Sequence, residues 1–176
     1  DLPAETPGEL WVRGIGVMDG YWNNAEANAN SFVDGWFRTG DIFVKTSKDF
    51  FRYVGRIKEM IKRSGENISA VEVETVIRQF AGIEDVAVIP VPHKIRGEEV
   101  KAVMTLRDGV DEKLFDFDAL RIHCETHLAH FKIPRYIEFV SSFEYTPSEK
   151  ITKTGLVKNN SLIGDWDYTI GGKIEP

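Results

Sequence analysis

The sequence is poor in cysteine, has no long apolar run and carries no excess of positive charge. Cys124 is its single cysteine, which excludes an internal disulfide framework and a cysteine-rich zinc module. No stretch reaches the roughly 18 apolar residues that a membrane-spanning helix needs, so no transmembrane segment is predicted. The formal net charge of −6 argues against a nucleic-acid partner, because phosphate backbones require positive patches. We therefore expect a cytoplasmic protein that does not bind nucleic acid.

What the sequence does contain is the composition of a globular protein, with 42% hydrophobic and 28% charged residues. Residues 1–10 are acidic and proline-rich, which is not typical of a signal peptide, and no initiating methionine precedes them. We therefore expect the chain to begin within a longer protein. Residues 1–55 are predicted to be rich in strands and too meagre to form a core alone. The expected elements are strands at 8–18, 35–41, 42–44 and 50–55 and a short helix or turn at 24–32.

Strands and helices alternate from residue 68 to 140, which predicts a small α/β domain. Ser69 and Glu72 have the spacing of a capping box, and apolar residues follow at helical intervals as far as the stop at Gly82. A second helix is expected at 114–130. The expected strands are Asp85–Val91, Glu99–Leu106 and Tyr136–Val140.

The predicted fold class is α+β. A small C-terminal α/β domain, with a three-stranded central sheet and flanking helices, follows the β-rich end of a larger N-terminal domain. The predicted boundaries are 1–56 for the β-rich part, 57–158 for the small domain and 159–176 for a tail.

Three segments have side chains or backbones suited to ligand chemistry. Asp41 ends a glycine-framed strand, where a carboxylate can accept two hydrogen bonds from a vicinal diol such as a ribose, although a turn aspartate explains the same residues. Lys58 lies where the composition shifts and is a candidate hinge, and Gly65 lets a ligand approach the backbone, although an ordinary basic turn also fits. Lys150 lies on a polar loop and can deliver positive charge to a phosphate, although a solvated surface lysine is the commoner case.

A histidine cluster offers a competing interpretation. His123, His127 and His130 are spaced at i, i+4 and i+7 next to Cys124, which places the imidazoles near one helix face and could bind zinc. No carboxylate has supporting spacing. We therefore expect no metal site in this chain.

Several motifs occur in an order that resembles one enzyme superfamily. They are GELWVRG at 8–14, GWFRTGD at 35–41, the GR pair at 55–56, SGENIS at 64–69, VEVE at 71–74, HFKIPR at 130–135 and PSEKITK at 147–153. The chain resembles the acyl-adenylate-forming superfamily of acyl-CoA synthetases, peptide-synthetase adenylation domains and beetle luciferases. The resemblance covers residues 8–158, and GRIKEMIKRSGENIS is similar to the acyl-CoA ligase branch.

The resemblance implies a role for each matching residue. It places Asp41 and Arg56 at the ribose of ATP or the adenylate, Tyr53 more loosely near the nucleotide, and Lys58 at the hinge. It implies that Gly65 lines the pantetheine tunnel and that Lys150 is the catalytic lysine of adenylation, bridging the attacking carboxylate and the α-phosphate. The residues implied to contact the nucleotide part of CoA are Phe131, Lys132 and Arg135.

Two departures and one omission qualify the resemblance. Glu149 stands where a glycine commonly precedes the catalytic lysine, and Asp49-Phe50 stands where a turn glycine is frequent. The superfamily's phosphate-binding loop and acyl pocket do not occur in this sequence, so Mg²⁺ ligands are expected outside it. The resemblance therefore implies a fragment that is inactive without the N-terminal domain.

The implied activity is an ATP-dependent acyl-CoA or aryl-CoA ligase acting on a small carboxylic acid. In the intact enzyme, the small domain is expected to rotate about Lys58 between adenylate formation and transfer to CoA. Two alternatives remain open at this point. One is an adenylation domain that loads a carrier protein, and the other is a stand-alone binding module without catalysis.

Overall fold

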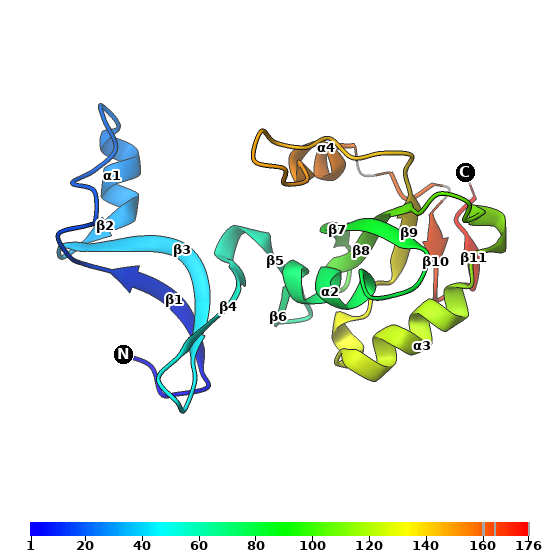
Figure 1. Cartoon of the computed structure of the whole chain (residues 1–176), viewed down its shortest axis with the longest axis horizontal. Helices are drawn as coiled ribbons and strands as arrows, with labels where there is room; N and C mark the ends of the chain where they lie inside the picture. The colour runs from blue at the N-terminus through cyan, green and yellow to red at the C-terminus, as the bar shows by residue number, and fades with distance from the viewer. Residues whose placement is uncertain (160, 164, 176) are drawn as a thin grey trace. The chain divides into compact units, whose positions relative to one another are not determined.

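A computed structural model describes residues 1–159, 161–163 and 165–175. The chain divides into two compact units between Lys58 and Glu59 (Figure 1). The division lies two residues after the boundary expected at residue 56. The predicted α+β class is confirmed, because each unit contains a sheet and the second combines its sheet with helices.

The first unit is an antiparallel sheet with one short helix. Its elements are β1 (Pro7–Val12), α1 (Ala25–Ser31), β2 (Phe32–Val33), β3 (Trp36–Lys45), β4 (Phe51–Arg56) and the 3-10 turn Ile57–Glu59, which runs across the boundary. β3 pairs with β1, β2 and β4. Asp34 and Gly35 join β2 to β3 with φ of +48° and +78°, the positive values that a two-residue hairpin turn requires.

The strands expected at 35–41 and 42–44 form one continuous strand, β3. Gly40 has a φ of +72° yet does not end the strand, since its N–H donates to the Glu9 carboxylate at 3.2 Å. The irregularity is absorbed by shifts in register after Glu9 and after Ile42. Val44 is the only fully buried hydrophobic residue in this unit, all of which the structure describes. The first unit therefore has almost no hydrophobic core of its own, as the sequence predicts.

The second unit is built on a larger mixed sheet. Its strands are β5 (Met60–Arg63), β6 (Glu66–Ser69), β7 (Ile83–His93), β8 (Gly97–Leu106), β9 (Tyr136–Phe139), β10 (Trp166–Asp167) and β11 (Gly172–Lys173). β7, β8 and β9 are the three strands expected from the sequence. β8 lies between antiparallel β7 and parallel β9, and β10 and β11 continue the sheet beyond β9.

Helices form where capping residues and apolar periodicity coincide. They are α2 (Ala70–Ile77), α3 (Phe117–His127), α4 (Lys153–Lys158) and the 3-10 turns Glu112–Leu114 and His130–Lys132. The Ser69 hydroxyl accepts the Glu72 N–H at 3.2 Å and begins α2 as predicted. The helix ends at Ile77, earlier than the apolar stripe, but Phe80 still packs on the core.

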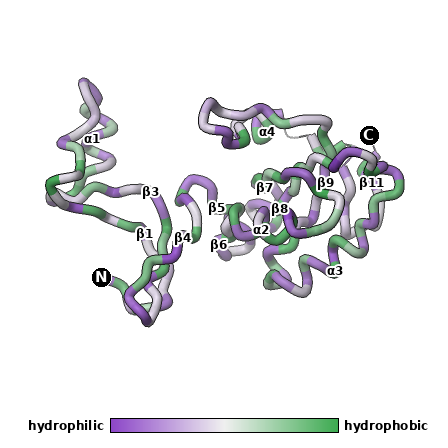
Figure 2. Tube along the Cα trace, in the orientation of Figure 1, coloured by the Kyte–Doolittle hydropathy of each residue, from purple (hydrophilic) through white to green (hydrophobic). Residues whose placement is uncertain are grey.

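The sheet is covered on both faces. Alternate residues of β7 and β8 join two apolar clusters, with Val86 and Ala102 in the large cluster that includes α2 and α3. Ala87 and Val103 join a smaller cluster with Phe143, against which Leu156 of α4 packs. Figure 2 shows apolar and polar residues alternating along α3, the pattern of a helix with one buried face.

The C-terminal segment differs from the tail expected at 159–176. β10 pairs with β9 through Trp166↔Ile137 and Asp167↔Tyr136, so this part of the segment belongs to the sheet. Residues 160, 164 and 176 of that expected tail lie outside the described residues. None of the helices in the described part of the chain has the length and apolarity that crossing a bilayer requires.

Candidate functional site

The three predicted nucleotide-binding residues lie on the paired strands β3 and β4. Asp41 and Arg56 face each other in register, and the Arg56 Nε lies 2.6 Å from the Asp41 Oδ1. Their side chains are 26% and 55% exposed, so solvent reaches both charges. Tyr53 is exposed and packs its ring edge-on to Phe43 at 5.5 Å between centroids. The hairpin thus presents a carboxylate, a guanidinium and an aromatic ring from adjacent strands.

Glu9 on β1 supports this hairpin and was missed by the sequence analysis. Its carboxylate accepts hydrogen bonds from Trp11 Nε1 at 2.8 Å, Arg38 Nε at 3.1 Å and the Gly40 N–H at 3.2 Å. Burial alone would raise the pKa of Glu9, but the bonds from Trp11 and Arg38 and the Arg38 charge outweigh it and lower the pKa. An ionised Glu9 therefore fixes the residue that precedes Asp41. Its place in the GELWVRG motif is the only sequence signal that marks it.

Lys58 and Gly65 occupy a turn and a hairpin tip. Lys58 is exposed in the 3-10 turn and is the last residue of the first unit. Ser64 and Gly65 form the two-residue turn between β5 and β6, with φ of +52° and +87°. A Cβ on Gly65 would meet no atom within 4 Å, so within this unit the backbone conformation, not space, favours glycine there.

Phe131 and Lys132 are bound to neighbouring elements of the second unit. The Phe131 carbonyl accepts from Arg63 Nη1 at 3.0 Å, and its ring packs against the core. The Lys132 Nζ lies 2.6 and 2.8 Å from the two carboxylate oxygens of Glu72 on α2. The Lys132 side chain is 21% exposed. Sequence reasoning did not predict this pairing of a basic residue with Glu72.

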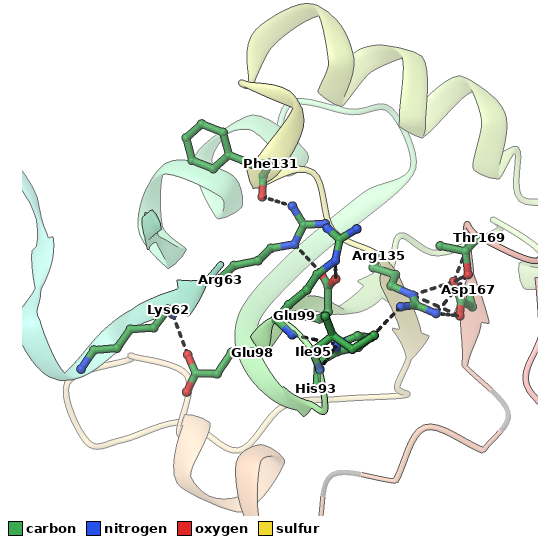
Figure 3. A network of polar contacts seen from close by, with 11 residues as sticks. Lys62, Arg63, His93, Ile95, Glu98, Glu99, Phe131, Arg135, Asp167 and Thr169 are labelled. Atoms are coloured by element: carbon green, nitrogen blue, oxygen red, sulfur yellow. Dashed lines mark hydrogen bonds and ion pairs between the residues drawn. The ribbon is translucent and has the colours of Figure 1, made fainter. Parts of the chain in front are cut away.

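Arg135 belongs to a polar network at the end of the sheet (Figure 3). Its Nη2 donates to the Asp167 Oδ2 at 2.8 Å and its Nη1 lies 3.1 Å from the His93 Nε2. Burial acts to raise the pKa of Asp167, but the bonds from Arg135 and from the Thr169 N–H and hydroxyl outweigh it and lower the pKa. The hydrogen bond to Asp167 is the main reason that the pKa of Arg135 is raised.

A second part of this network centres on Glu99, which is fully buried on β8. Arg63 Nε lies 2.6 Å from one oxygen of Glu99 (Figure 3). Arg96 Nε lies 3.2 Å from the other oxygen. Two guanidinium groups therefore share one buried carboxylate, and Arg63 also holds the Phe131 carbonyl. The sequence analysis missed this network because its members are far apart along the chain.

Lys150 is presented on a closed, exposed turn. The Thr146 N–H donates to the Lys150 carbonyl at 2.8 Å, and the Lys150 N–H donates back to the Thr146 hydroxyl at 3.1 Å. Glu149 has a φ of +59°, a left-handed conformation that suits glycine and explains why a glycine is common there. Within the described residues the Lys150 ammonium forms no ion pair. Its charge is therefore available to a ligand.

Two side-chain contacts hold the Lys150 turn to the unit. Lys153 Nζ lies 2.6 Å from the Glu74 carboxylate, which also accepts the Val88 N–H of β7 at 2.7 Å. On the other side of the turn, the Tyr145 hydroxyl donates to the Asp85 carboxylate at 3.2 Å. The turn is thus exposed at its tip and anchored at both ends.

The histidine cluster has no metal-binding geometry among the residues that the structure describes. His123 Nε2 lies 2.9 Å from the Val76 carbonyl, so that nitrogen carries the proton. His127 Nδ1 lies 2.8 Å from the His123 carbonyl and is protonated for the same reason. Cys124 is buried, and burial, aided by the charge of Glu125, raises the pKa of its thiol to about 11.

Comparison with known proteins identifies the family. Residues 72–150 match the model of the AMP-binding enzyme C-terminal domain. These residues are similar to the C-terminal domain of AMP-binding enzymes. The superfamily resemblance is therefore confirmed, and the matched region ends at Lys150.

The relatives include acyl-CoA ligases. A mitochondrial medium-chain acyl-CoA ligase of Macaca fascicularis is 40% identical over 149 residues, 84% of this chain and 24% of that protein. A feruloyl-CoA synthase of Amycolatopsis is 40% identical over 152 residues, 86% of this chain and 30% of that protein.

A solved adenylate-forming enzyme has the same fold. The o-succinylbenzoate CoA synthetase of Bacillus subtilis, in complex with its acyl-adenylate, superposes with a TM-score of 0.82 and 28% identity. The superposition covers 91% of this chain and 32% of that one. The chain thus spans about a quarter to a third of the length of these relatives.

Proposed function

We propose that the chain is part of an ATP-dependent acyl-CoA or aryl-CoA ligase. A carboxylate oxygen of the acid attacks the α-phosphorus of ATP, which gives an acyl-adenylate and releases pyrophosphate. The thiolate of CoA then attacks the acyl carbon, and AMP leaves. The observation that carries the proposal is the Lys150 ammonium, which forms no ion pair with the described residues and is held on an anchored turn at the end of the matched region.

Lys150 is proposed to act in the first step alone. A fixed ammonium stabilises the negative charge that develops on the α-phosphate and orients the attacking carboxylate. Its exposure at the turn tip supports this role, since a group that acts on a substrate must reach beyond its own unit. The anchoring ion pair between Lys153 and Glu74 supports it further, because it limits how far the turn can move.

Asp41, Arg56 and Tyr53 are proposed to hold the nucleotide. The Asp41 carboxylate would accept the ribose hydroxyls while Arg56 donates to the ribose and Tyr53 offers its ring face. Partial exposure of all three on neighbouring strands supports the assignment. Any Mg²⁺ that accompanies ATP is proposed to be held by residues outside this segment.

The second unit is proposed to rotate about Lys58 between the two steps. The division between compact units immediately after this residue supports a hinge there. Rotation would withdraw Lys150 and bring Gly65 to the pantetheine arm, with Phe131, Lys132 and Arg135 near the nucleotide part of CoA. One pocket can then serve two reactions that need different groups at the same carbon.

The test separates the two half-reactions in the full-length protein that contains this chain. Lys150→Ala is expected to slow acyl-adenylate formation by roughly 10²-fold or more, because it removes a transition-state charge. Transfer of the acyl group from supplied acyl-adenylate to CoA should remain. Lys158→Ala removes an exposed lysine of α4 and is the matched control.

Equal loss of both half-reactions in the Lys150 variant would contradict its assignment. Transfer to a carrier-protein thiol but not to CoA would favour the carrier-loading alternative. The isolated chain should catalyse no ATP–pyrophosphate exchange, and turnover by it would refute its proposed dependence on further protein.

A further inference from the structure

The segment that follows α4 lies beyond the region matched by the family model, yet its carboxylates pair with two cations of the sheet. Asp165 lies 2.6 Å from the Lys101 ammonium, and Asp167 binds the Arg135 guanidinium. Asp165 and Asp167 are both buried. Two carboxylates outside the matched region therefore hold Lys101 and Arg135, which lie inside it.

The contact between Asp167 and Arg135 fixes the plane of the guanidinium. Arg135 Nε lies 3.1 and 3.2 Å from the two Asp167 oxygens, and Nη2 lies 2.8 Å from Oδ2. The Thr169 hydroxyl lies 3.0 Å from the same Nη2. Bidentate pairing of this kind adds orientation as well as energy.

Asp167 is itself held rigidly. Its backbone pairs with Tyr136 between β10 and β9. Its Oδ1 accepts the Thr169 N–H at 2.8 Å and the Thr169 hydroxyl at 2.7 Å. The carboxylate therefore cannot follow the guanidinium if Arg135 moves.

The remaining nitrogen of Arg135 points toward His93. Nη1 lies 3.1 Å from the His93 Nε2, and the Arg135 side chain is 23% exposed (Figure 3). The other ring nitrogen of His93 accepts the N–H groups of Ile95 and Arg96, each at 3.2 Å. The imidazole is thus fixed by the loop after β7, and Asp167 determines which guanidinium nitrogen faces it.

We propose that Asp167 is a positioning residue that orients Arg135 toward the phosphates of CoA. The inference rests on the proposed function, from which the contact between Arg135 and CoA comes. It assigns part of the CoA site to the C-terminal segment. A purely structural ion pair would stabilise the fold without affecting CoA.

The orientation itself is measured by NMR in the 176-residue chain. Held by the Asp167 carboxylate and the Thr169 hydroxyl, the Arg135 guanidinium should rotate slowly, giving a resolved and protected Nε–H signal. Asp167→Asn should broaden or lose this signal, while Asp167→Glu should restore it in part. Glu112→Gln is the matched control, since it makes the same change in charge and breaks the exposed 2.8 Å pair with Lys173 of the same segment.

The consequence for CoA is measured in the full-length protein. Asp167→Asn should raise the KM for CoA in acyl transfer by about tenfold, the effect expected when an oriented charge-assisted hydrogen bond is lost. Adenylate formation should be unchanged, and Glu112→Gln should affect neither step.

Each contrary result has a distinct meaning. An Asp167→Asn variant with an unchanged or lower KM for CoA overturns the positioning role, because Asp167 would then only neutralise Arg135. A wild-type guanidinium that rotates freely overturns it as well. Failure of the wild-type protein to use CoA at all overturns the proposed function and this inference together, and is recognised without any variant.

Discussion

Asp165→Asn is expected to destabilise the second unit because it removes a counter-ion from a buried lysine. Lys101 lies on β8 and is 1% exposed. Its ammonium is 2.6 Å from Asp165, 3.0 Å from Glu138 and 3.0 Å from the Ser161 carbonyl. A buried ammonium without adequate counter-charge loses its hydration and gains little in return.

The size of the effect follows from burial of the two carboxylates. Breaking a buried ion pair costs about 3–5 kcal/mol. Asp165 is 4% exposed, but Glu138 at 38% still faces Lys101, which favours the lower end, about 3 kcal/mol. Glu138→Gln should cost less than about 1 kcal/mol, since solvent already screens that carboxylate.

The assay uses Cys124 as a reporter of the second unit alone. It is the single cysteine, is 2% exposed and joins the core cluster of that unit. Its alkylation in a urea series therefore measures unfolding of the second unit without signal from the first. With a typical urea dependence, a loss of 3 kcal/mol lowers the midpoint by roughly 1–2 M.

Two outcomes would refute the reasoning. The Asp165→Asn variant unfolding within about 0.5 M urea of the wild type would mean that Asp165 contributes little to holding Lys101. Glu138→Gln costing as much as Asp165→Asn would mean that burial does not decide which carboxylate matters.

Three further predictions follow from local geometry. Cys124 should alkylate slowly in the native chain at pH 8 and rapidly in urea, because a pKa of about 11 leaves only about a thousandth of the thiol ionised. The pKa of Asp167 is lowered, so its ionised form stabilises the fold above about pH 4, and this contribution is lost as the pH falls further. The free energy of unfolding of Asp167→Asn should therefore fall less steeply with decreasing pH than that of the wild type. Glu149 and Gly65 both have positive φ, a conformation that costs less for glycine than for other residues. Glu149→Gly should therefore raise the free energy of unfolding by about 0.5–1 kcal/mol, and Gly65→Ala should lower it by about 1 kcal/mol. Thermal denaturation measures both changes.

Local patterns in the sequence predict most of the helices and strands. A polar turn at 46–49 joins two apolar runs, and this turn sets the register that pairs Phe43 with Tyr53. The shift of one residue after Ile42, which brings Arg56 opposite Asp41, has no such local signal. Ser69 and Glu72 likewise mark the start of α2 from local sequence, because the hydrogen bond from the Glu72 N–H to the Ser69 hydroxyl joins residues only three apart in the chain. Such features depend on neighbours in the chain and can be predicted from them.

The departures from the superfamily pattern also have a local explanation. Asp49 and Glu149 stand where glycines are common, and both have left-handed backbones with φ of +60° and +59°. The glycines of relatives therefore reflect backbone conformation at a turn. Neither substitution alters a predicted ligand-binding group.

Long-range charge pairing could not be predicted from the sequence. Glu99 and Lys101 alternate with apolar residues on β8, which is typical of a strand with one solvated face. Both are buried with distant partners: Arg63 of β5 pairs with Glu99, and the segment after α4 supplies Asp165 and the Ser161 carbonyl to Lys101. Nothing in the composition of 159–176 marks it as the source of a counter-ion.

The two units differ in how much of their apolar surface they bury. The second unit buries a large cluster from both sheet and helices, whereas Val44 alone is fully buried among the hydrophobic residues of the first. Trp11, Trp36 and Phe51 remain exposed on that first sheet and line a cavity of about 620 Å³ beside Lys45. Apolar burial is the main source of stability, so the first unit requires further protein surface to form a stable sheet. Asp41 and Arg56, the residues proposed to bind the nucleotide, lie on that same sheet, so we expect their precise geometry to depend on the surface that covers it.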